Sequence, residues 1–219
     1  MFDRFRDDED LGPEQAREQL VDRLASSGRI SDEATLDALR SVPRHEFVPD
    51  AKADRAYEDR PLPIGDGQTI SAPHMVGIMT ELLDVEPGDR VLEIGTGCGY
   101  HAAVTTEVVG NGNVYSVEYG RRLGEKARER LGRLGYDVHV RIGDGREGWP
   151  EHAPYDAAYL TCAAASLPDA VAEQIRTDGV ILAPIGTTRQ TLYRYEKRAD
   201  GGLDRSSHGG VRFVSMRGE

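Results

Sequence analysis

The chain has 219 residues and a mass of 24.0 kDa, which suits one domain with a small cap rather than two full-sized domains. Hydrophobic residues make up 38% and charged residues 30%, so the chain can build a core and wholesale disorder is excluded. Lys and Arg number 27 against 38 Asp and Glu, and the formal net charge of −11 argues against binding to nucleic acid or to an anionic membrane.

Two helices and an ordered loop are predicted in the first 70 residues. Residues 1–12 are charged and aperiodic, which predicts a frayed end. Residues 14–27 carry apolar side chains on one helical face, and Ser31-Asp32 offers an N-cap to a second helix that ends before Pro43. Residues 43–70 are rich in Pro, Gly and Asp, which predicts an ordered loop.

A third helix is predicted from Ser71 to the turn at Pro87-Gly88. Ser71 can cap this helix and Pro73 fits its first turn. A stripe of apolar residues then follows at helical spacing: Met75, Met79, Leu82 and Leu83.

From residue 90 the pattern changes to strands that alternate with helices. Strands are predicted at 90–94, 113–118, 138–142, 155–161 and 179–185, with helices up to 109, at 121–134 and at 168–176. This alternation predicts right-handed βαβ units and a mostly parallel sheet. The last two runs, 191–198 and 211–216, have no helix between them, so they predict an antiparallel pair, unlike a dinucleotide fold made of two equal halves.

The first chemical motif is the turn Gly95-Thr96-Gly97-Cys98-Gly99 after the strand that contains Glu93. Glycines permit a tight turn and close approach of a ligand to the backbone. Tyr100 stands where the dinucleotide fingerprint has its third glycine, which disfavours a pyrophosphate. An adenosyl group that carries a charged amino acid needs only such a turn and an acidic neighbour.

Acidic residues follow the next two strands at the same sheet edge. Glu118 ends the second strand, where one carboxylate can accept hydrogen bonds from both ribose hydroxyls; the alternative is an ordinary strand-end acid. Asp144 in Gly143-Asp-Gly145 can match the N6 donor of adenine while a backbone N–H matches N1; the alternative is a simple Asp-Gly turn.

The segment from Ile64 to His74 admits two interpretations. On propensity alone, Ser71 is a helix cap. The segment also places hydroxyls and backbone donors at a helix N-terminus, which suits a carboxylate.

Other classes of site are not supported by the sequence. The histidines show no metal-ligand spacing, and the two cysteines, Cys98 and Cys162, cannot form a disulfide framework or a four-cysteine zinc site. With no signal-peptide pattern or membrane-spanning run, we expect a cytoplasmic protein. The acid excess and only three lysines predict a halophilic protein; a GC-rich genome explains the shortage of lysine but not the excess of acid.

In this order the motifs resemble the protein-L-isoaspartate O-methyltransferase family over roughly residues 42–216. The most specific stretch is Pro61-Leu-Pro-Ile-Gly-Asp-Gly-Gln-Thr-Ile-Ser-Ala-Pro-His-Met75, supported by Val91–Tyr100, Gly143–Gly145 and 153–157. The resemblance implies an α/β fold: a seven-stranded, mostly parallel Rossmann-like methyltransferase sheet with an antiparallel C-terminal strand and an N-terminal helical cap. It also implies methyl transfer from S-adenosylmethionine to the α-carboxylate of L-isoaspartyl residues in damaged proteins and peptides, which starts their repair.

The resemblance also implies roles for single residues. Ser71 is the expected catalytic residue, on the substrate side, and Glu118 is expected to hold the ribose. Ile64 to Gly67 and His74 would border cofactor and substrate, Gly95 and Gly97 the methionine moiety, and Asp144 with Gly145 the adenine. The cofactor-binding set expected in full is Ile64, Gly65, Asp66, Gly67, His74, Glu93, Gly95, Thr96, Gly97, Gly99, Glu118, Asp144, Gly145 and Thr161, with no metal ligand.

Two departures from the family pattern lie near the expected rim of the site. Thr161-Cys162-Ala163 stands in place of Thr-Ala-Ala, and Phe213-Val-Ser-Met216 in place of Phe-Val-Pro-Leu.

We therefore expect residues 1–85 to cap a methyltransferase core at 86–219, as one monomeric structural unit. Its expected partners are isoaspartyl proteins and peptides, with no nucleic acid and no membrane. Two alternatives remain open: a class I methyltransferase that acts on another carboxylate or a small molecule, and a cofactor-binding paralogue without catalysis. An NAD-dependent oxidoreductase is disfavoured by Tyr100 and by the antiparallel end of the sheet.

Overall fold

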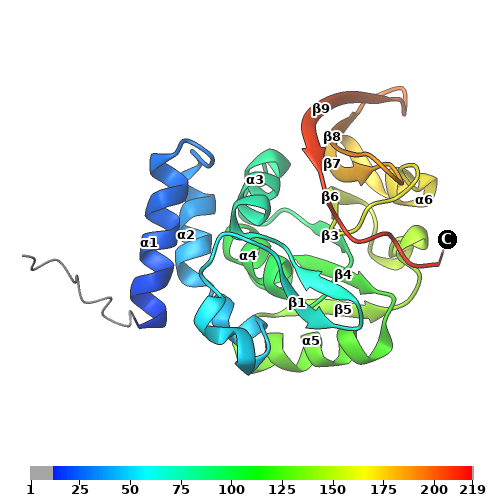
Figure 1. Ribbon diagram of the computed structural model, residues 1–219. Coiled ribbons are helices and arrows are strands. Elements are labelled where there is room, and N and C mark those ends of the chain that lie inside the picture. The colour runs from blue at the N-terminus through cyan, green and yellow to red at the C-terminus, as the bar shows by residue number, and fades with distance from the viewer. Residues whose placement is uncertain (1–11, 219) are drawn as a thin grey trace, which may run out of the picture.

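A computed structural model describes residues 12–218 of the chain (Figure 1). Residues 1–11, which hold nearly all of the predicted frayed end, lie outside the described part. Within it, no helix is long and apolar enough to cross a membrane.

A seven-stranded sheet forms the centre of the molecule, in the order β5-β4-β3-β6-β7-β8-β9. Its first five strands in space are parallel, whereas β8 runs antiparallel to both β7 and β9. This confirms the predicted class, a mostly parallel α/β sheet with an antiparallel end. The strands are β3 (Val91–Ile94), β4 (Val114–Glu118), β5 (Val138–Ile142), β6 (Tyr155–Leu160), β7 (Ile175–Ile185), β8 (Gln190–Lys197) and β9 (Leu203–Val211).

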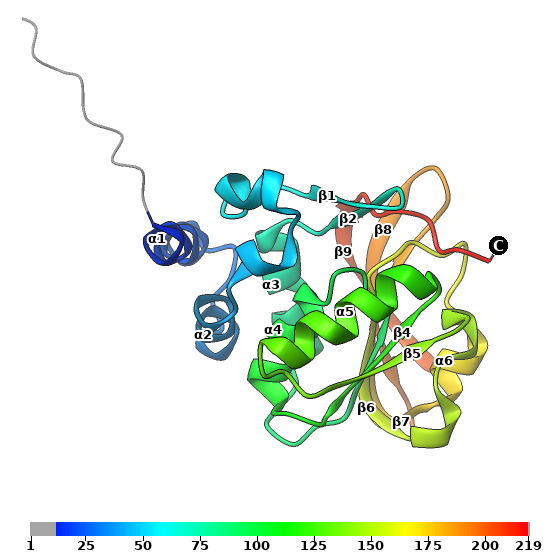
Figure 2. The same ribbon diagram turned by 90° about the horizontal axis from the view of Figure 1, so that it is seen from below.

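Helices cover both faces of the sheet (Figure 2). On one face α3 (Pro73–Leu83) and α4 (Tyr100–Val109) pack on β3, β6 and β7. On the other face α6 (Asp169–Glu173) packs on β6 and β7 with Val171 fully buried. The helix α5 (Arg121–Arg133) buries Leu131 beside α4.

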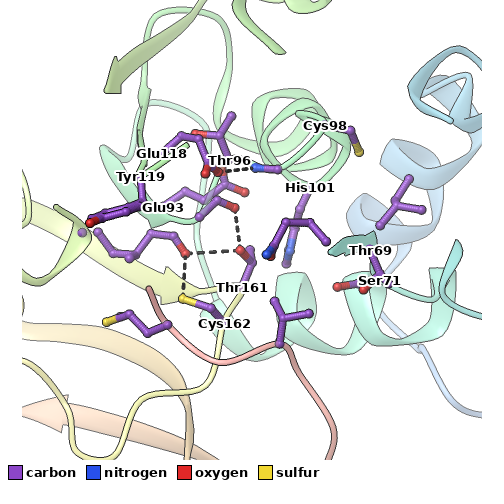
Figure 3. Close-up of a pocket in the computed structure, with 18 of the residues that line it drawn as sticks. Thr69, Ser71, Glu93, Thr96, Cys98, His101, Glu118, Tyr119, Thr161 and Cys162 are labelled. Carbon is purple, nitrogen blue, oxygen red and sulfur yellow. Dashed lines mark hydrogen bonds between the residues drawn. The ribbon is translucent and has the colours of Figure 1, made fainter. Parts of the chain in front are cut away.

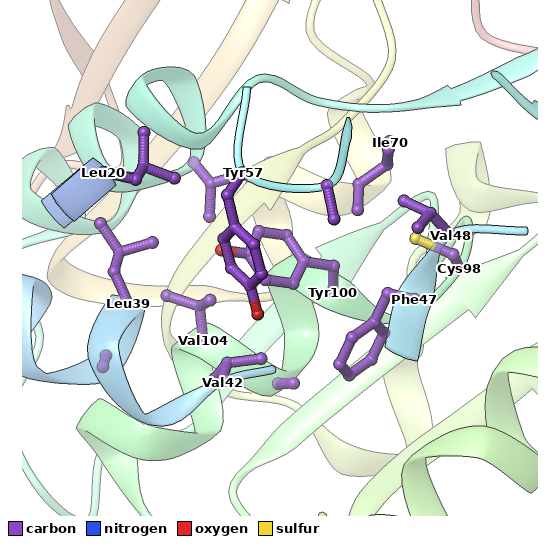
Figure 4. Close-up of a cluster of buried hydrophobic side chains, with 14 of the residues drawn as sticks. Leu20, Leu39, Val42, Phe47, Val48, Tyr57, Ile70, Cys98, Tyr100 and Val104 are labelled. Atoms are coloured by element: carbon purple, nitrogen blue, oxygen red, sulfur yellow. The ribbon is translucent and has the colours of Figure 1, made fainter. Parts of the chain in front are cut away.

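The N-terminal helices share a hydrophobic core with the sheet region (Figure 4). The helices α1 (Pro13–Ser26) and α2 (Glu33–Ser41) and the short 3₁₀ turns η1 (Arg44–Phe47) and η2 (Asp50–Arg55) precede the site. Asp32 caps α2 as predicted, with its side chain accepting from the amide of Thr35. Phe47 of η1 packs edge-on against Tyr100 of α4, with ring centroids 5.6 Å apart.

The predicted loop at 43–70 contains a small antiparallel hairpin that the sequence did not indicate. Its strands are β1 (Leu62–Gly65) and β2 (Gln68–Ile70), with Leu62 opposite Ile70. Asp66 and Gly67 form the turn with positive φ angles of 53° and 71°. Each strand is too short to show a clear alternation, so only the turn residues were a usable signal.

The prediction of a last strand at 211–216 is wrong in its bounds. β9 spans Leu203–Val211 and begins directly after the turn at Asp200–Gly202. Nearly all of its side chains are exposed, from Asp204 to Gly210, so it has no buried face to produce an apolar alternation. An exposed edge strand of this kind depends on backbone pairing with β8, which the residue pattern does not reveal.

Candidate active site

A pocket lies where the strands β3, β4 and β6 reach their carboxyl ends, the edge at which open α/β sheets bind ligands. In Figure 3, Thr69 and Ser71 lie on one side of the pocket, and Glu118 and Tyr119 lie on the other. The C-terminal segment 214–217 supplies a further wall. The residues that line the pocket are Gln68–Ser71, Val76, Glu93–Cys98, Tyr100, His101, Val117–Tyr119, Gly145, Thr161, Cys162 and Val214–Arg217.

The glycine turn between β3 and α4 is shaped for close approach. Gly95, Gly97 and Gly99 have positive φ angles of 101°, 57° and 91°, which side chains disfavour. A Cβ at Gly95 would stand 2.3 Å from Oγ1 of Thr161, which itself donates to the Gly95 carbonyl at 2.5 Å. The turn therefore brings the ends of β3 and β6 together, and its glycines Gly95 and Gly97 present backbone to the pocket.

Glu118 holds this turn in place from the end of β4. One carboxylate oxygen accepts from the amide of Gly97 at 2.9 Å and the other from the amide of Gly120 at 2.8 Å. The residue is 7% exposed and lines the pocket. Because a carboxylate can accept about four hydrogen bonds, two positions remain for hydroxyl donors of a ligand.

Tyr119 follows Glu118 and is 51% exposed, the only exposed large hydrophobic side chain in the described chain. It lines the pocket, so its ring offers a flat apolar surface beside the carboxylate.

Glu93 lines the floor of the pocket but offers no solvent-exposed surface there. Its side chain is completely buried, opposite Ser116 of β4 and Tyr159 of β6 in the ladder. Ser116 donates to one carboxyl oxygen and Tyr159 donates to the other at 2.9 Å. Burial raises the pKa of Glu93 to about 8, although both hydrogen bonds lower it. This geometry assigns Glu93 to the support of the strand ends.

The structure corrects the interpretation of Ser71 as a helix cap. The N-cap of α3 is Ala72, and no side chain caps this helix. Ser71 lines the pocket, and its hydroxyl forms no hydrogen bond to another described residue. The hydroxyl is therefore available to a ligand.

The structure brings together only part of the predicted set. Ser71, Glu93, Gly95, Thr96, Gly97, Glu118, Gly145 and Thr161 line the pocket. Ile64, Gly65, Asp66, Gly67, His74, Gly99 and Asp144 do not, although Ile64 lies near Gly97.

Several of the residues outside the lining have partners elsewhere. His74 hydrogen-bonds Asp59 through its backbone amide at 2.9 Å and its ring Nδ1 at 2.8 Å. Asp144 accepts from the backbone and side chain of Arg146, which lowers its pKa. A Cβ at Gly99 would contact Leu131 at 3.0 Å, so this glycine permits helix packing.

Other lining residues were not predicted. No local pattern marks Tyr119, which the fold brings beside the glycine motif. The tail Val214 to Arg217 is distant from that motif in sequence, and only the family pattern at Phe213–Met216 placed it near the rim of the site. The parallel bridge between Ala163 and Ser215 brings the tail to the pocket, with two backbone hydrogen bonds of 2.8 Å. The departures at Cys162, Ser215 and Met216 all line the pocket.

The groups that line the pocket fit an adenosyl cofactor. A backbone-lined turn, a carboxylate with free acceptor positions and an adjacent exposed aromatic ring match a methionine moiety, a ribose and a flat base. Among residues 12–218, no group of three or more His, Cys, Asp or Glu is placed to hold a metal ion.

Comparison with known proteins gives consistent results. The family model for protein-L-isoaspartate(D-aspartate) O-methyltransferase matches residues 15–219. Protein-L-isoaspartate O-methyltransferase 2 of Archaeoglobus fulgidus is 50% identical over 208 residues, 94% of each chain. The Methanopyrus kandleri protein-L-isoaspartate O-methyltransferase is 50% identical over 208 residues, covering 93% of this chain and 92% of its own.

Solved structures show the same fold. A protein-L-isoaspartate O-methyltransferase structure superposes with a TM-score of 0.84 at 33% identity, over 92% of this chain and 66% of that longer chain. A Plasmodium falciparum structure in complex with S-adenosyl-L-homocysteine superposes with a TM-score of 0.80 at 22% identity, covering 93% of this chain and 99% of that one.

Proposed function

Because the chain belongs to the protein-L-isoaspartate(D-aspartate) O-methyltransferase family, we propose that its pocket binds the methyl donor and an isoaspartyl residue side by side. The protein is a transferase that uses S-adenosylmethionine to methylate the α-carboxylate of L-isoaspartyl residues, the first step of their repair. The observation that carries the site proposal is the hydroxyl of Ser71, which faces the pocket without a described partner, across from Glu118.

Glu118 and the glycine turn form the proposed cofactor side. S-adenosylmethionine, when bound, supplies a methyl group on a positively charged sulfur. Glu118 would accept from the ribose hydroxyls with the acceptor positions that Gly97 and Gly120 leave free. Tyr119 would cover the base, and the backbone of Gly95 and Gly97 would border the methionine moiety.

Ser71 forms the proposed substrate side. The α-carboxylate of an isoaspartyl residue has an ordinary pKa of about 3.3–3.9, so it is ionised at neutral pH and no residue has to remove a proton. Ser71 would donate a hydrogen bond that orients this carboxylate. The hairpin β1–β2 and the tail, which form neighbouring walls, would exclude water.

We also propose that the protein is a monomer of the cytoplasm that tolerates high salt. In the described chain Tyr119 is the only exposed large hydrophobic residue, and it belongs to the pocket, so no such side chain outside the pocket supports a subunit contact. The net charge of −11 supports tolerance of high salt, and the two cysteines without a disulfide support a location in the reducing cytoplasm. Light scattering at low and molar KCl tests the oligomeric state.

The decisive experiment is transfer of labelled methyl to an isoaspartyl peptide beside its normal aspartyl twin. We expect methylation of the first only, and a loss of at least tenfold in Ser71→Ala. Equal labelling of both peptides, or labelling of a small-molecule acid alone, would contradict the proposal.

A further inference from the structure

A second groove lies beside the pocket, at the same edge of the sheet. It is lined by the connection between β7 and β8 with the first residues of β8, and by the end of β9 with the chain that follows it: residues 187–191 and 210–213. Phe213 belongs to this groove, and the next residue, Val214, belongs to the pocket. The same short segment of tail therefore walls both cavities.

The junction between the two cavities is rigidly built. The side-chain amide of Gln190 accepts from the backbone N–H of Phe213 at 2.6 Å and donates to its carbonyl at 3.0 Å. The amide of Gly186 donates to the carbonyl of Ala164 at 2.9 Å, which ties the end of β7 to the segment after Thr161. These bonds fix the groove relative to the pocket.

The groove is positively charged in a strongly acidic molecule. Arg189 and Arg212 line it and are exposed, and neither forms an ion pair or side-chain hydrogen bond with another described residue. By contrast, Arg198, in the turn between β8 and β9, pairs with Asp204 at 2.6 Å. No Asp or Glu occurs among the groove-lining residues, so two uncompensated guanidinium groups flank one cavity.

We infer that this groove binds an acidic side chain of the substrate, on a residue that flanks the isoaspartyl residue. The inference rests on the proposed function, because it needs the isoaspartyl residue in the pocket. Guanidinium groups pair well with carboxylates, and the hydroxyls of Thr187 and Thr188 add donors.

The spacing of the two cavities limits where that acid can stand. Arg212 is two to four residues along the tail from Val214–Met216, or about 7–13 Å at the rise of an extended chain. A peptide bound in extended form would therefore bring an acid two to four residues from the isoaspartyl position into the groove.

The test is a scan of isoaspartyl peptides in dilute buffer. A single Glu is moved from four residues before to four residues after the isoaspartyl position, and each peptide has a twin with Gln there. Acetylated and amidated ends separate a side-chain carboxylate from a terminal one. For wild type we expect KM to be about three- to tenfold lower with Glu than with Gln at one or two positions, and kcat to change little, because such a contact binds ground and transition state alike.

Single variants identify the groove. Arg189→Gln and Arg212→Gln should each reduce the ratio of the two KM values towards one. Arg23→Gln is the matched control, since it removes from α1 an exposed arginine that has no ion pair with another described residue. Figure 1 shows α1 on the far side of the molecule from β8, so this variant should keep the ratio.

The outcomes separate this inference from the proposed function. If isoaspartyl peptides are methylated but no position prefers Glu, or the preference survives in both groove variants, the inference is wrong and the function stands. If no isoaspartyl peptide is methylated, the proposed function fails and the inference fails with it.

Discussion

Ser71 is the residue whose role depends most on its surroundings. The next residue along the chain, Ala72, is the N-cap of α3, so the hydroxyl of Ser71 does not cap the helix. Its side chain lines the pocket instead, opposite Glu118. A residue type that is favoured at helix N-termini is thereby free to serve a ligand.

We predict that Ser71→Ala and Ser71→Gly each lower activity toward an isoaspartyl peptide by tenfold or more, because a hydrogen bond to a charged group is worth about 1.5–3 kcal/mol. Stability should change little in both, since no described hydrogen bond of the fold is lost, and Ser71→Thr should retain part of the activity. Steady-state kinetics and thermal melts measure both effects, with affinity for S-adenosylmethionine as a control that stays nearly constant. Full activity in Ser71→Gly would move the substrate contact to Thr69.

We predict that Glu118→Ala weakens binding of S-adenosylmethionine by at least tenfold. The change removes the proposed ribose acceptor and also releases the amide of Gly97, which shapes the glycine turn. Calorimetric titration measures the affinity. Glu125→Ala is the matched control, because it removes one exposed acid of α5, paired with Arg121, without touching the pocket; similar losses in both variants would contradict a specific role for Glu118.

Glu93 predicts a pH dependence of stability. Its folded pKa of about 8 lies above the ordinary value of 4.5. Between these two pH values the Glu93 carboxyl keeps its proton in the folded protein and loses it in the unfolded chain. The contribution of Glu93 to stability therefore falls as pH rises to about 8. His101 acts in the opposite direction only between its folded pKa of about 3 and the ordinary 6.5. The contribution of His101 fades above pH 6.5, so the decrease in stability from pH 6.5 to 8 reports mainly on Glu93.

We expect the free energy of unfolding of the wild type to include a decrease of about 1–2 kcal/mol across that window from this group. Glu93→Gln keeps an acceptor for Tyr159 but cannot ionise, so its stability should fall by correspondingly less. Urea denaturation at pH 6.5, 7.2 and 8 measures the difference. Parallel curves for the two proteins would show that Glu93 has no raised pKa.

At the scale of elements, the hairpin β1–β2 is tied to distant parts of the chain. Arg122 of α5 pairs with the carboxylate of Asp66 in the hairpin turn, and Arg217 of the tail donates to the Asp66 carbonyl. The pair lowers the pKa of Asp66. Since the hairpin and tail both wall the pocket, these contacts close one side of it.

We predict that Arg122→Gln speeds dissociation of S-adenosylhomocysteine about two- to fivefold, because an exposed ion pair is weak but holds a wall that has to move. Stopped-flow displacement measures the rate. Arg121→Gln is the control, one residue away with the same charge change, since Arg121 pairs with Glu125 on its own helix. Equal rates in both variants would show that the hairpin is not held by this pair.

At the scale of the whole molecule, the charge of −11 predicts a response to salt. The ion pairs described are largely at the surface and contribute little each, whereas the net repulsion acts over the entire chain. The Debye length falls to ~3 Å in molar salt, so the melting temperature should rise by a few degrees from dilute buffer to molar KCl.

The control for the effect of salt on the melting temperature is the same experiment at a lower pH. Near the pI of about 5.1 the net charge is close to zero, and the same addition of KCl should have much less effect. A flat or falling melting temperature at pH 7 would leave codon bias as the explanation of the composition.

The sequence by itself determined the fold class, the order of most elements and the chemistry at the ends of the parallel strands. These features depend on local signals: apolar runs of strand length, glycines that permit positive φ, and acids at the end of β4 and two residues beyond β5. Family resemblance in 61–75 indicated the activity, and the family match confirmed it.

The tertiary structure decided what no local pattern contains. It placed Tyr119 and the tail residues 214–217 in the pocket, turned Glu93 inward to Ser116 and Tyr159, and left His74 with Asp59. It also produced β9, an edge strand with almost no buried face. In each case the physical reason is a contact between segments far apart in sequence, whose energy depends on the packed arrangement and leaves no periodic trace in the residues themselves.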